Sequence, residues 1–236
     1  MTSTRPTAAA AALLAALVGA TAFVVGCAGA PAKGTGAAAA LVPAADTAKA
    51  GVLASFVGRP LVVAPTQRLR VAADAPPWAP AASDTRDYLA ALDDEITSAL
   101  TDRGVAGGWQ LAEQVARSAR RNPTFATDAH ALAIDQLLPS ARAAAVDLRD
   151  PLRSQLRAMT ALSEARDVLV PVELRFERVA GDPSAARAVL HLALVDTRLA
   201  RVRWSGDVAG DAATSLSAAL LASVADRVAN LAAPAR

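Results

Sequence analysis

The sequence predicts an α+β fold: a mixed sheet with a C-terminal antiparallel three-strand meander, and helices packed on the sheet. Two changes in the spacing of apolar residues support this prediction. Up to Ala165 they recur mainly every three or four residues, the period of a helix, after one short apolar run. After Arg166 they alternate with polar residues, as in half-buried strands, and from about Thr214 the helical period returns. This closing helix is expected to cover one face of the sheet.

The first strand and the first helix have clear boundaries. The apolar run 61–64 lies between two prolines and predicts a short buried strand. A helix is expected after Ser83 or Asp84, either of which could cap it, and it should end at Gly104, which allows a left-handed turn. Its buried face is expected to consist of Leu89, Leu92, Ile96 and Leu100.

Three short helical pieces are predicted in the middle of the chain. The first begins at Trp109 and ends at Asn122, and the second runs from Thr127 to Leu138. The third opens at Asp150, which is followed by a proline in the first helical position, where a missing amide hydrogen costs nothing.

The meander has an expected inside and outside. In its first strand, one face is predicted to carry Val170, Val172, Leu174 and Phe176, and the other Glu173, Arg175 and Glu177. Pro171 indicates that this strand starts at a sheet edge or contains a bulge. The third strand is expected to turn Val202, Trp204 and Val208 inward.

The N-terminus has the three-part layout of an export signal. A single positive charge at Arg5 precedes an uncharged and mostly apolar run, residues 8–25, and then Gly26 and the only cysteine, Cys27. Residues 24–27 resemble the lipobox of bacterial lipoproteins, which implies cleavage before Cys27 and acylation of its thiol. An uncleaved membrane-spanning helix and a plain cleaved signal are the alternatives.

This interpretation divides the chain into three parts. Residues 1–26 form the signal peptide, 27–57 the lipidated N-terminus with a flexible linker rich in small residues, and 58–236 a single α+β domain. Removal of the signal takes away one of 24 basic residues and none of 22 acidic ones, which leaves a net charge of +1. So balanced a charge does not indicate a nucleic-acid partner.

The order of elements resembles a recurrent domain of bacterial envelope lipoproteins. The residues that carry the resemblance are the strand before Pro65, the turn aspartate Asp196, and Trp204 returning before Gly206. Related families are the curli secretion lipoprotein, the lipoprotein activators of penicillin-binding proteins and the N-terminal domain of TolB. The resemblance implies binding in the envelope, and leaves open whether a second strand follows the first helix, where the helical spacing from Trp109 differs from the family pattern.

Few residues suggest catalysis. The two histidines, His130 and His191, lie about sixty residues apart in sequence, and Ser205 lacks the flanking pattern of a nucleophile elbow. The three consecutive acids 93–95 point in different directions on a helix and are interpreted as a solvated face. One cysteine and two histidines provide no zinc ligand set. No catalytic, cofactor or metal site is therefore predicted.

Two features could contact a partner. Arg117, Arg120 and Arg121 form the only basic cluster, suited to phosphate or carboxylate groups, although a solvated helix surface is the alternative. Trp78 lies in a proline-rich loop, where it could anchor a partner or fold back on the core.

The expected function is that of a lipid-anchored, non-enzymatic binding or assembly component in the periplasm. It would be held by acyl chains, and its partner would be another envelope protein or a second copy. Ala28 after the cysteine, in place of an aspartate, favours the outer membrane. A small-ligand or lipid-binding lipoprotein and an envelope hydrolase are the alternatives.

Overall fold

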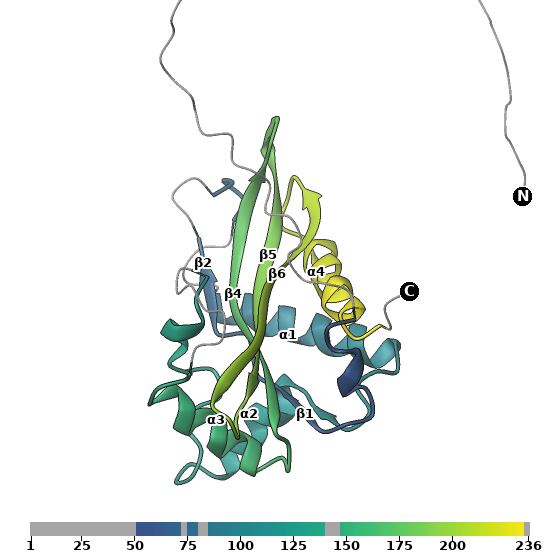
Figure 1. Ribbon diagram of the computed structural model, residues 1–236. Helices are drawn as coiled ribbons and strands as arrows, with labels where there is room; N and C mark the ends of the chain where they lie inside the picture. The colour runs from purple at the N-terminus through teal and green to yellow at the C-terminus, as the bar shows by residue number, and fades with distance from the viewer. Residues whose placement is uncertain (1–50, 72–74, 80–84, 140–146, 234–236) are drawn as a thin grey trace, which may run out of the picture. The chain divides into compact units, whose positions relative to one another are not determined.

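The computed structural model describes residues 51–71, 75–79, 85–139 and 147–233, all of which belong to one unit (Figure 1). The predicted signal peptide, Cys27, and the predicted caps Ser83 and Asp84 lie outside these residues. The lipid anchor at Cys27, the signal peptide and the helix caps therefore stay predictions.

A six-stranded mixed sheet forms the centre of the described part of the chain. Its strands are β1 (Leu61–Val63), β2 (Arg68–Arg70), β3 (Trp109–Gln110), β4 (Asp167–Val179), β5 (Asp182–Asp196) and β6 (Arg201–Ala213). The order is β3-β1-β4-β5-β6, and β2 pairs with β4 beyond β1. The β3-β1-β4 and β2-β4 pairs are parallel, whereas β4-β5-β6 is antiparallel. The predicted fold class, with its C-terminal meander, is confirmed.

Helices cover both faces of the sheet. The helices are α1 (Thr85–Asp102), α2 (Ala112–Arg121), α3 (Leu152–Ala161) and α4 (Ala218–Asn230), with short 3-10 helices at Ala54–Phe56 and Ile134–Leu137. One apolar cluster joins α1 and α4 to the sheet, and a second joins α2 and α3 to the opposite face. Figure 1 shows α2 and α3 together at the lower end of the sheet. Strand β1 contributes to both clusters, because successive side chains point to opposite faces: Leu61 and Val63 to one, Val62 to the other.

Bulges change the faces predicted for the meander. The β4–β5 register shifts between Pro171 and Glu173, so Val170 and Val172 lie in one apolar cluster, whereas Leu174 and Phe176 lie in the other. One extra residue reverses the alternation downstream of the shift, so the prediction of a single face was wrong.

A second irregularity separates the residues predicted to point inward from β6. The β5–β6 register shifts between Leu194 and Val195, and Val202 joins the cluster of α2 and α3. Trp204 and Val208 join the cluster of α1 and α4.

A second strand does follow the first helix. Trp109 pairs with Leu61 in the two-residue strand β3, and helix α2 begins only at Ala112, so the helical piece predicted from Trp109 starts three residues late. The indole of Trp109 is buried, and its Nε1 donates a hydrogen bond to the carbonyl of Phe56 (2.9 Å). A strand of two residues shows no alternation by which the sequence could reveal it.

The helix predicted from Thr127 to Leu138 reduces to the 3-10 turn Ile134–Leu137. Side chains satisfy the backbone upstream of this turn: Gln67 bonds to the carbonyl of Ala129 and the amide of Leu132, and Gln155 accepts from the amide of Ala133. These bonds replace those of a helix.

Residues just before Gly58 belong to the packed structure. Leu53 is fully buried, Phe56 lies in the same apolar cluster, and the amide of Leu53 bonds to the carbonyl of Leu231 (2.8 Å). The end of the predicted linker, residues 27–57, therefore contributes two side chains to the core.

Candidate functional site

Asp196, at the end of β5, organises the turn between β5 and β6. Its side chain is completely buried, with 0% exposure. Oδ1 accepts the amide of Leu199 (2.9 Å), while Oδ2 accepts from Arg166 Nε (3.0 Å) and Arg203 Nη2 (2.7 Å). One carboxylate thus connects the backbone of the turn to the guanidinium groups of two arginines.

The electrostatics of this network favour the ionised carboxylate. Burial alone would raise the pKa of Asp196, but the hydrogen bond from Arg166, the amide of Leu199 and the bond from Arg203 together hold that pKa well below its ordinary value. Asp167 lies beside it, with Oδ1 3.0 Å from Arg203 Nε. Burial, and the nearby charge of Asp196, raise the pKa of Asp167, while Arg203 opposes that rise.

Neighbouring elements fix the turn from several sides. Thr197 donates from its amide (3.0 Å) and its hydroxyl (2.8 Å) to the carbonyl of Arg166. From helix α3, Arg157 Nε donates to the carbonyl of Thr197 (3.3 Å). The carbonyl of Ala200, a residue with a positive φ of 54°, accepts from the amide of Leu148 (2.7 Å). Leu199, between these contacts, is 59% exposed. A network of fixed polar groups therefore holds an apolar side chain out in solvent.

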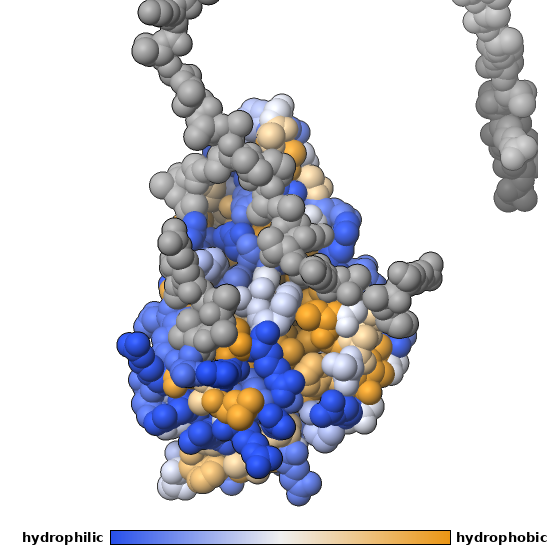
Figure 2. Space-filling model, in the orientation of Figure 1, coloured by the Kyte–Doolittle hydropathy of each residue, from blue (hydrophilic) through white to orange (hydrophobic). Residues whose placement is uncertain are grey.

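An open depression of about 400 Å³ lies against this turn. It is lined by Asp147, Leu148, Arg153, Arg157, Leu199, Ala200 and Arg201. Figure 2 shows a small apolar patch enclosed by hydrophilic surface where Figure 1 places the β5–β6 turn. We refer to the depression and its exposed leucine as the turn site.

Two of the three arginines of the turn site already have acidic partners. Arg201 Nε lies 2.7 Å from Asp147, and Arg153 pairs with Asp150. Among the described residues, no carboxylate pairs with the side chain of Arg157. The site therefore offers an unneutralised guanidinium beside an apolar side chain.

The arginines predicted to bind a partner lie on helix α2, outside the turn site. Arg117 Nη2 lies 2.7 Å from Glu113, and Arg120 is 3.6 Å from the same carboxylate. Arg121 is exposed in the last turn of the helix. Solvated ion pairs of this type contribute little to stability. Their role in binding stays a prediction.

Trp78 contacts the β4–β5 hairpin. Its ring meets Phe176 edge to face at 5.8 Å between centroids, and Nε1 donates to the carbonyl of Ser184 (3.1 Å). The side chain is partly buried against the apolar cluster of α1 and α4. Trp78 thus joins a loop to the hairpin, and a role for its remaining exposed surface in binding stays a prediction.

His191 is oriented by Asp207. Nδ1 lies 2.6 Å from Asp207 Oδ1. Burial would raise the pKa of Asp207, but hydrogen bonds from His191 and Arg175 lower that pKa to about 2. Because an ionised carboxylate only accepts, Nδ1 must be the donor. His130 is exposed and lies outside this arrangement.

His191 and Ser205 line one pocket, but they do not form a nucleophile pair. The pocket measures about 50 Å³, and within the described residues no hydrogen bond joins the serine hydroxyl to the imidazole. A hydrolytic serine needs a base within hydrogen-bond reach and donors for the oxyanion. The geometry thus orients a histidine without assembling a triad.

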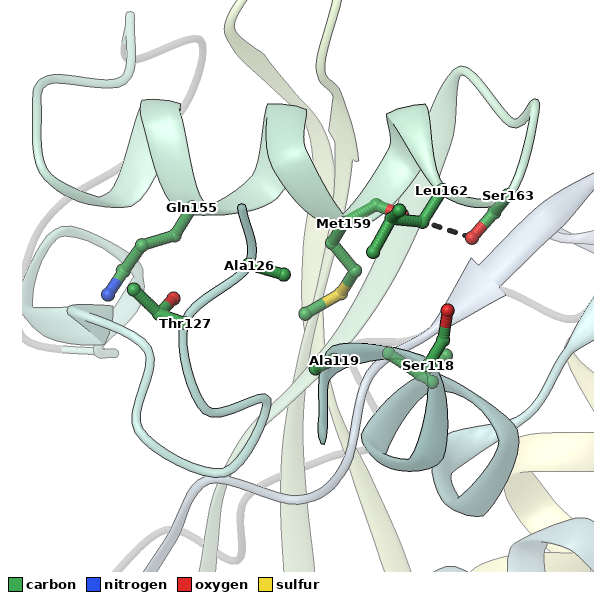
Figure 3. A pocket seen from close by; sticks show the side chains of 9 residues that line it. Ser118, Ala119, Ala126, Thr127, Gln155, Met159, Leu162 and Ser163 are labelled. Atoms are coloured by element: carbon green, nitrogen blue, oxygen red, sulfur yellow. Dashed lines mark hydrogen bonds between the residues drawn. The ribbon is translucent and has the colours of Figure 1, made fainter. Parts of the chain in front are cut away.

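The interior between α2 and α3 is nearly full. A pocket of about 10 Å³ lies there, lined by residues that include Ala119, Ala126 and Met159, whose thioether extends between the two helices (Figure 3). This volume is close to that of one water site. It is far below the several hundred cubic ångströms that small-molecule sites usually enclose.

Asp93 corrects the interpretation of residues 93–95 as a solvated face. Its carboxylate is only 8% exposed and accepts from both the amide (2.9 Å) and the hydroxyl (2.6 Å) of Thr66. Asp94 is exposed as expected. Asp93 therefore serves to hold the loop after β1 against helix α1.

Sequence reasoning noted Asp196 as a turn residue but did not identify the turn site. Arg157 lines the site, and Arg166 and Arg203 hold Asp196 beneath it; the three come from different segments, and only folding brings them together. Leu199 in a turn of polar residues was the one local signal.

Across the described ranges, no helix combines the length and apolarity that a membrane crossing requires. In the same residues, no three His, Cys, Asp or Glu side chains gather in a group able to hold a metal ion.

Comparisons with known proteins provide structural neighbours. No family model matches the sequence, and neither does any curated protein. Among solved structures, the chain is similar to the C-terminal domain of LpoB from Salmonella enterica, at 15% identity over 68% of this chain and 94% of that one, with a TM-score of 0.31. The LpoB C-terminal domain from Escherichia coli matches at 15% identity over 69% and 96%, with a TM-score of 0.32. A PelC dodecamer from Paraburkholderia phytofirmans matches at 11% identity over 80% and 94%, with a TM-score of 0.33.

Proposed function

We propose that this chain is a lipid-anchored envelope protein that acts by binding another protein, and that the turn site is its docking surface. The observation that carries the proposal is the buried network around Asp196, which presents Leu199 to solvent. Binding energy at protein interfaces concentrates in a few rigidly held apolar and arginine side chains. The turn site brings both kinds together.

Forming this network costs free energy that a turn without a buried charge would not require. Burying a carboxylate requires desolvation, and apolar side chains of similar volume often stabilise a fold as well as a buried ion pair does. What the network adds is a fixed backbone at Leu199. A surface held in its binding conformation loses less entropy when a partner docks. The arrangement is therefore suited to recognition.

The location follows from the sequence. The export signal and the lipobox-like residues 24–27 support acylation at Cys27, and Ala28 favours the outer membrane with the domain in the periplasm. A chain anchored in this way meets its partner close to a membrane surface.

The small-ligand alternative has less support. The two partly enclosed pockets described above measure about 10 and 50 Å³, and the larger depression is open and lined by charged side chains. Ligand sites usually enclose several hundred cubic ångströms behind mostly apolar walls.

Photocrosslinking in whole cells tests the proposal. A photoreactive residue is placed at Leu199, at Trp78 and at Arg120, and at the exposed Ala90 of helix α1 as the control. We expect a discrete protein adduct from position 199 and none from position 90. Capture of nothing from position 199, by a chain that is exported and folded, would refute the turn site as a docking surface.

A further inference from the structure

The turn site also indicates the chemistry of what docks there. Resting on the proposed function, we infer that the partner presents an acidic protein segment, in which an apolar side chain is flanked by carboxylates. The apolar side chain meets Leu199, and a carboxylate pairs with the guanidinium of Arg157.

The charge of the site selects an acidic partner. Its lining holds three arginines and one aspartate. Asp147 and Asp150 neutralise Arg201 and Arg153, so Arg157 carries the remaining charge. The sequence neighbours Arg149 and Arg198 are exposed and add to the positive field. A carboxylate arriving here gains attraction from several arginines.

The side chain of Arg157 has hydrogen-bond donors that no group of the described chain uses. Arg157 donates from Nε to the carbonyl of Thr197, and within the described residues its two Nη groups have no hydrogen bond. The Nη groups form one edge of the planar fork that binds carboxylates in bidentate geometry. Carboxylate oxygens of a partner can reach these Nη groups, because Arg157 is exposed.

The apolar part of the site argues for a protein segment over a purely anionic ligand. Leu199 is 59% exposed at the rim, while Leu148 and Ala200 form apolar parts of the lining. Inorganic phosphate or a lipid headgroup would use the arginines and leave this apolar surface in water.

Fluorescence anisotropy with labelled peptides tests this inference on the purified full chain in nonionic detergent micelles. The probe is a twelve-residue peptide in which glutamates flank two leucines. One matched peptide has glutamine for every glutamate, and another has serine for both leucines. We expect the first peptide to bind, and each matched peptide to bind about tenfold more weakly.

Paired variants locate the binding. Arg157→Glu is compared with Arg86→Glu, an exposed arginine of helix α1, and Leu199→Ala is compared with Phe125→Ala, another exposed apolar side chain (58%). Binding should weaken about tenfold in the first member of each pair and stay unchanged in the second. Equal effects within a pair, or equal binding of the glutamine peptide, would overturn the inference.

A soluble lipid headgroup distinguishes a membrane from a protein segment, because the proposed acyl anchor would hold every variant on a vesicle. Calorimetric titration with glycerophosphoglycerol, the headgroup of phosphatidylglycerol without its acyl chains, should show no binding to the unaltered chain or to Arg157→Glu. Binding by the unaltered chain and not by Arg157→Glu, without peptide binding, would assign the site to anionic lipid and contradict the inference.

The two proposals can fail separately. Position 199 could crosslink a protein segment that has no excess of acidic residues, with capture unchanged in Arg157→Glu. That result would support the docking surface and refute the acidic partner. If position 199 captures nothing, the docking surface itself is refuted.

Discussion

At the scale of single residues, the pKa values of two buried carboxyl groups are shifted in opposite directions. Asp196 accepts from two guanidinium groups, and its pKa is lowered despite its burial. For Asp93, burial raises the pKa to about 6, because no cation pairs with it in the described structure and the hydrogen bonds from Thr66 only partly offset the desolvation. Whether the hydrogen-bond partner is charged or neutral therefore decides whether the pKa of a buried carboxyl group falls or rises.

The substitution Asp196→Asn tests the network of the turn. It keeps the size of the side chain but removes the charge between Arg166 and Arg203. We expect the free energy of unfolding to fall by about 2–3 kcal/mol, less than the roughly 3–5 kcal/mol typical of breaking a fully buried pair, because both arginines are partly exposed and screened. Urea denaturation at neutral pH measures the change. As a control, Asp211→Asn removes the charge of an exposed pair with Arg227, and less than about 0.5 kcal/mol should be lost.

Asp93 predicts a pH dependence of stability. Its pKa in the folded state, about 6, lies above the value of roughly 3.9 for an unfolded chain. The folded state therefore holds the proton more tightly, and this contribution to stability is lost as the pH rises from about 4 to 6. Relative to Asp93→Asn, which does not titrate, the unaltered chain should lose roughly 2–3 kcal/mol across this window.

Chemical denaturation at several pH values measures this difference. Asp87→Asn, an exposed position on the same helix, provides the control and should follow the unaltered chain. A constant difference between the unaltered chain and Asp93→Asn from pH 4 to 7 would show that Asp93 does not titrate in this range.

At the scale of elements, close packing of α4 on β6 depends on Gly210. A Cβ at this position would lie 2.5 Å from Ser223 Oγ and 2.8 Å from Val224 Cγ2. The same serine hydroxyl accepts the amide of Asp211 (3.0 Å), so it cannot move without losing that bond. The close contact between β6 and α4 therefore requires a residue without a side chain at position 210.

Gly210→Ala should consequently destabilise the fold. Overpacking at such a contact costs about 1–3 kcal/mol. Gly107→Ala is the matched control, because a Cβ there meets nothing within 4 Å and no positive φ is required. Thermal unfolding of both variants measures the difference. Equal melting temperatures would mean that α4 can shift away from β6 without loss.

At the scale of the whole molecule, the packed structure extends upstream of Gly58. A chain that begins at Gly51 keeps Leu53 and Phe56 in the core, whereas one that begins at Gly58 loses both. We expect the shorter chain to be less stable by several kcal/mol, since each large buried side chain contributes about 2–5 kcal/mol. Urea denaturation of the two chains compares them directly, and equal stability would place residues 51–57 outside the cooperative unit.

The proposed anchor is tested by Cys27→Ser. Labelled palmitate should be incorporated into the unaltered chain and not into the variant, because the serine hydroxyl replaces the thiol that takes the acyl group. Mass spectrometry of the natural product should find no Met1. An intact Met1, or an unmodified Cys27, would contradict the lipid anchor and the location proposed from it.

Local sequence signals were sufficient wherever an element buries one regular face. Leu89, Leu92, Ile96 and Leu100 lie on the buried side of α1, as their spacing predicted, and Gly104 has the positive φ expected of a helix stop. The presence of the three long strands of the meander and of the closing helix was likewise predictable from their periods, although bulges exchange the faces of the strands. Hydrophobic burial on one side of a regular element leaves a repeating pattern along the chain.

The tertiary structure alone decided the strand register, the short strand β3, the loop in place of an expected helix, and the turn site. Bulges near Pro171 and in β6 reverse the alternation, strand β3 is too short to show any, and Gln67 and Gln155 replace the hydrogen bonds of an expected helix. The turn site unites side chains from residues 147–148, α3, the β5–β6 turn and the start of β6. Register and contacts between distant segments depend on packing in three dimensions, which a local period cannot encode.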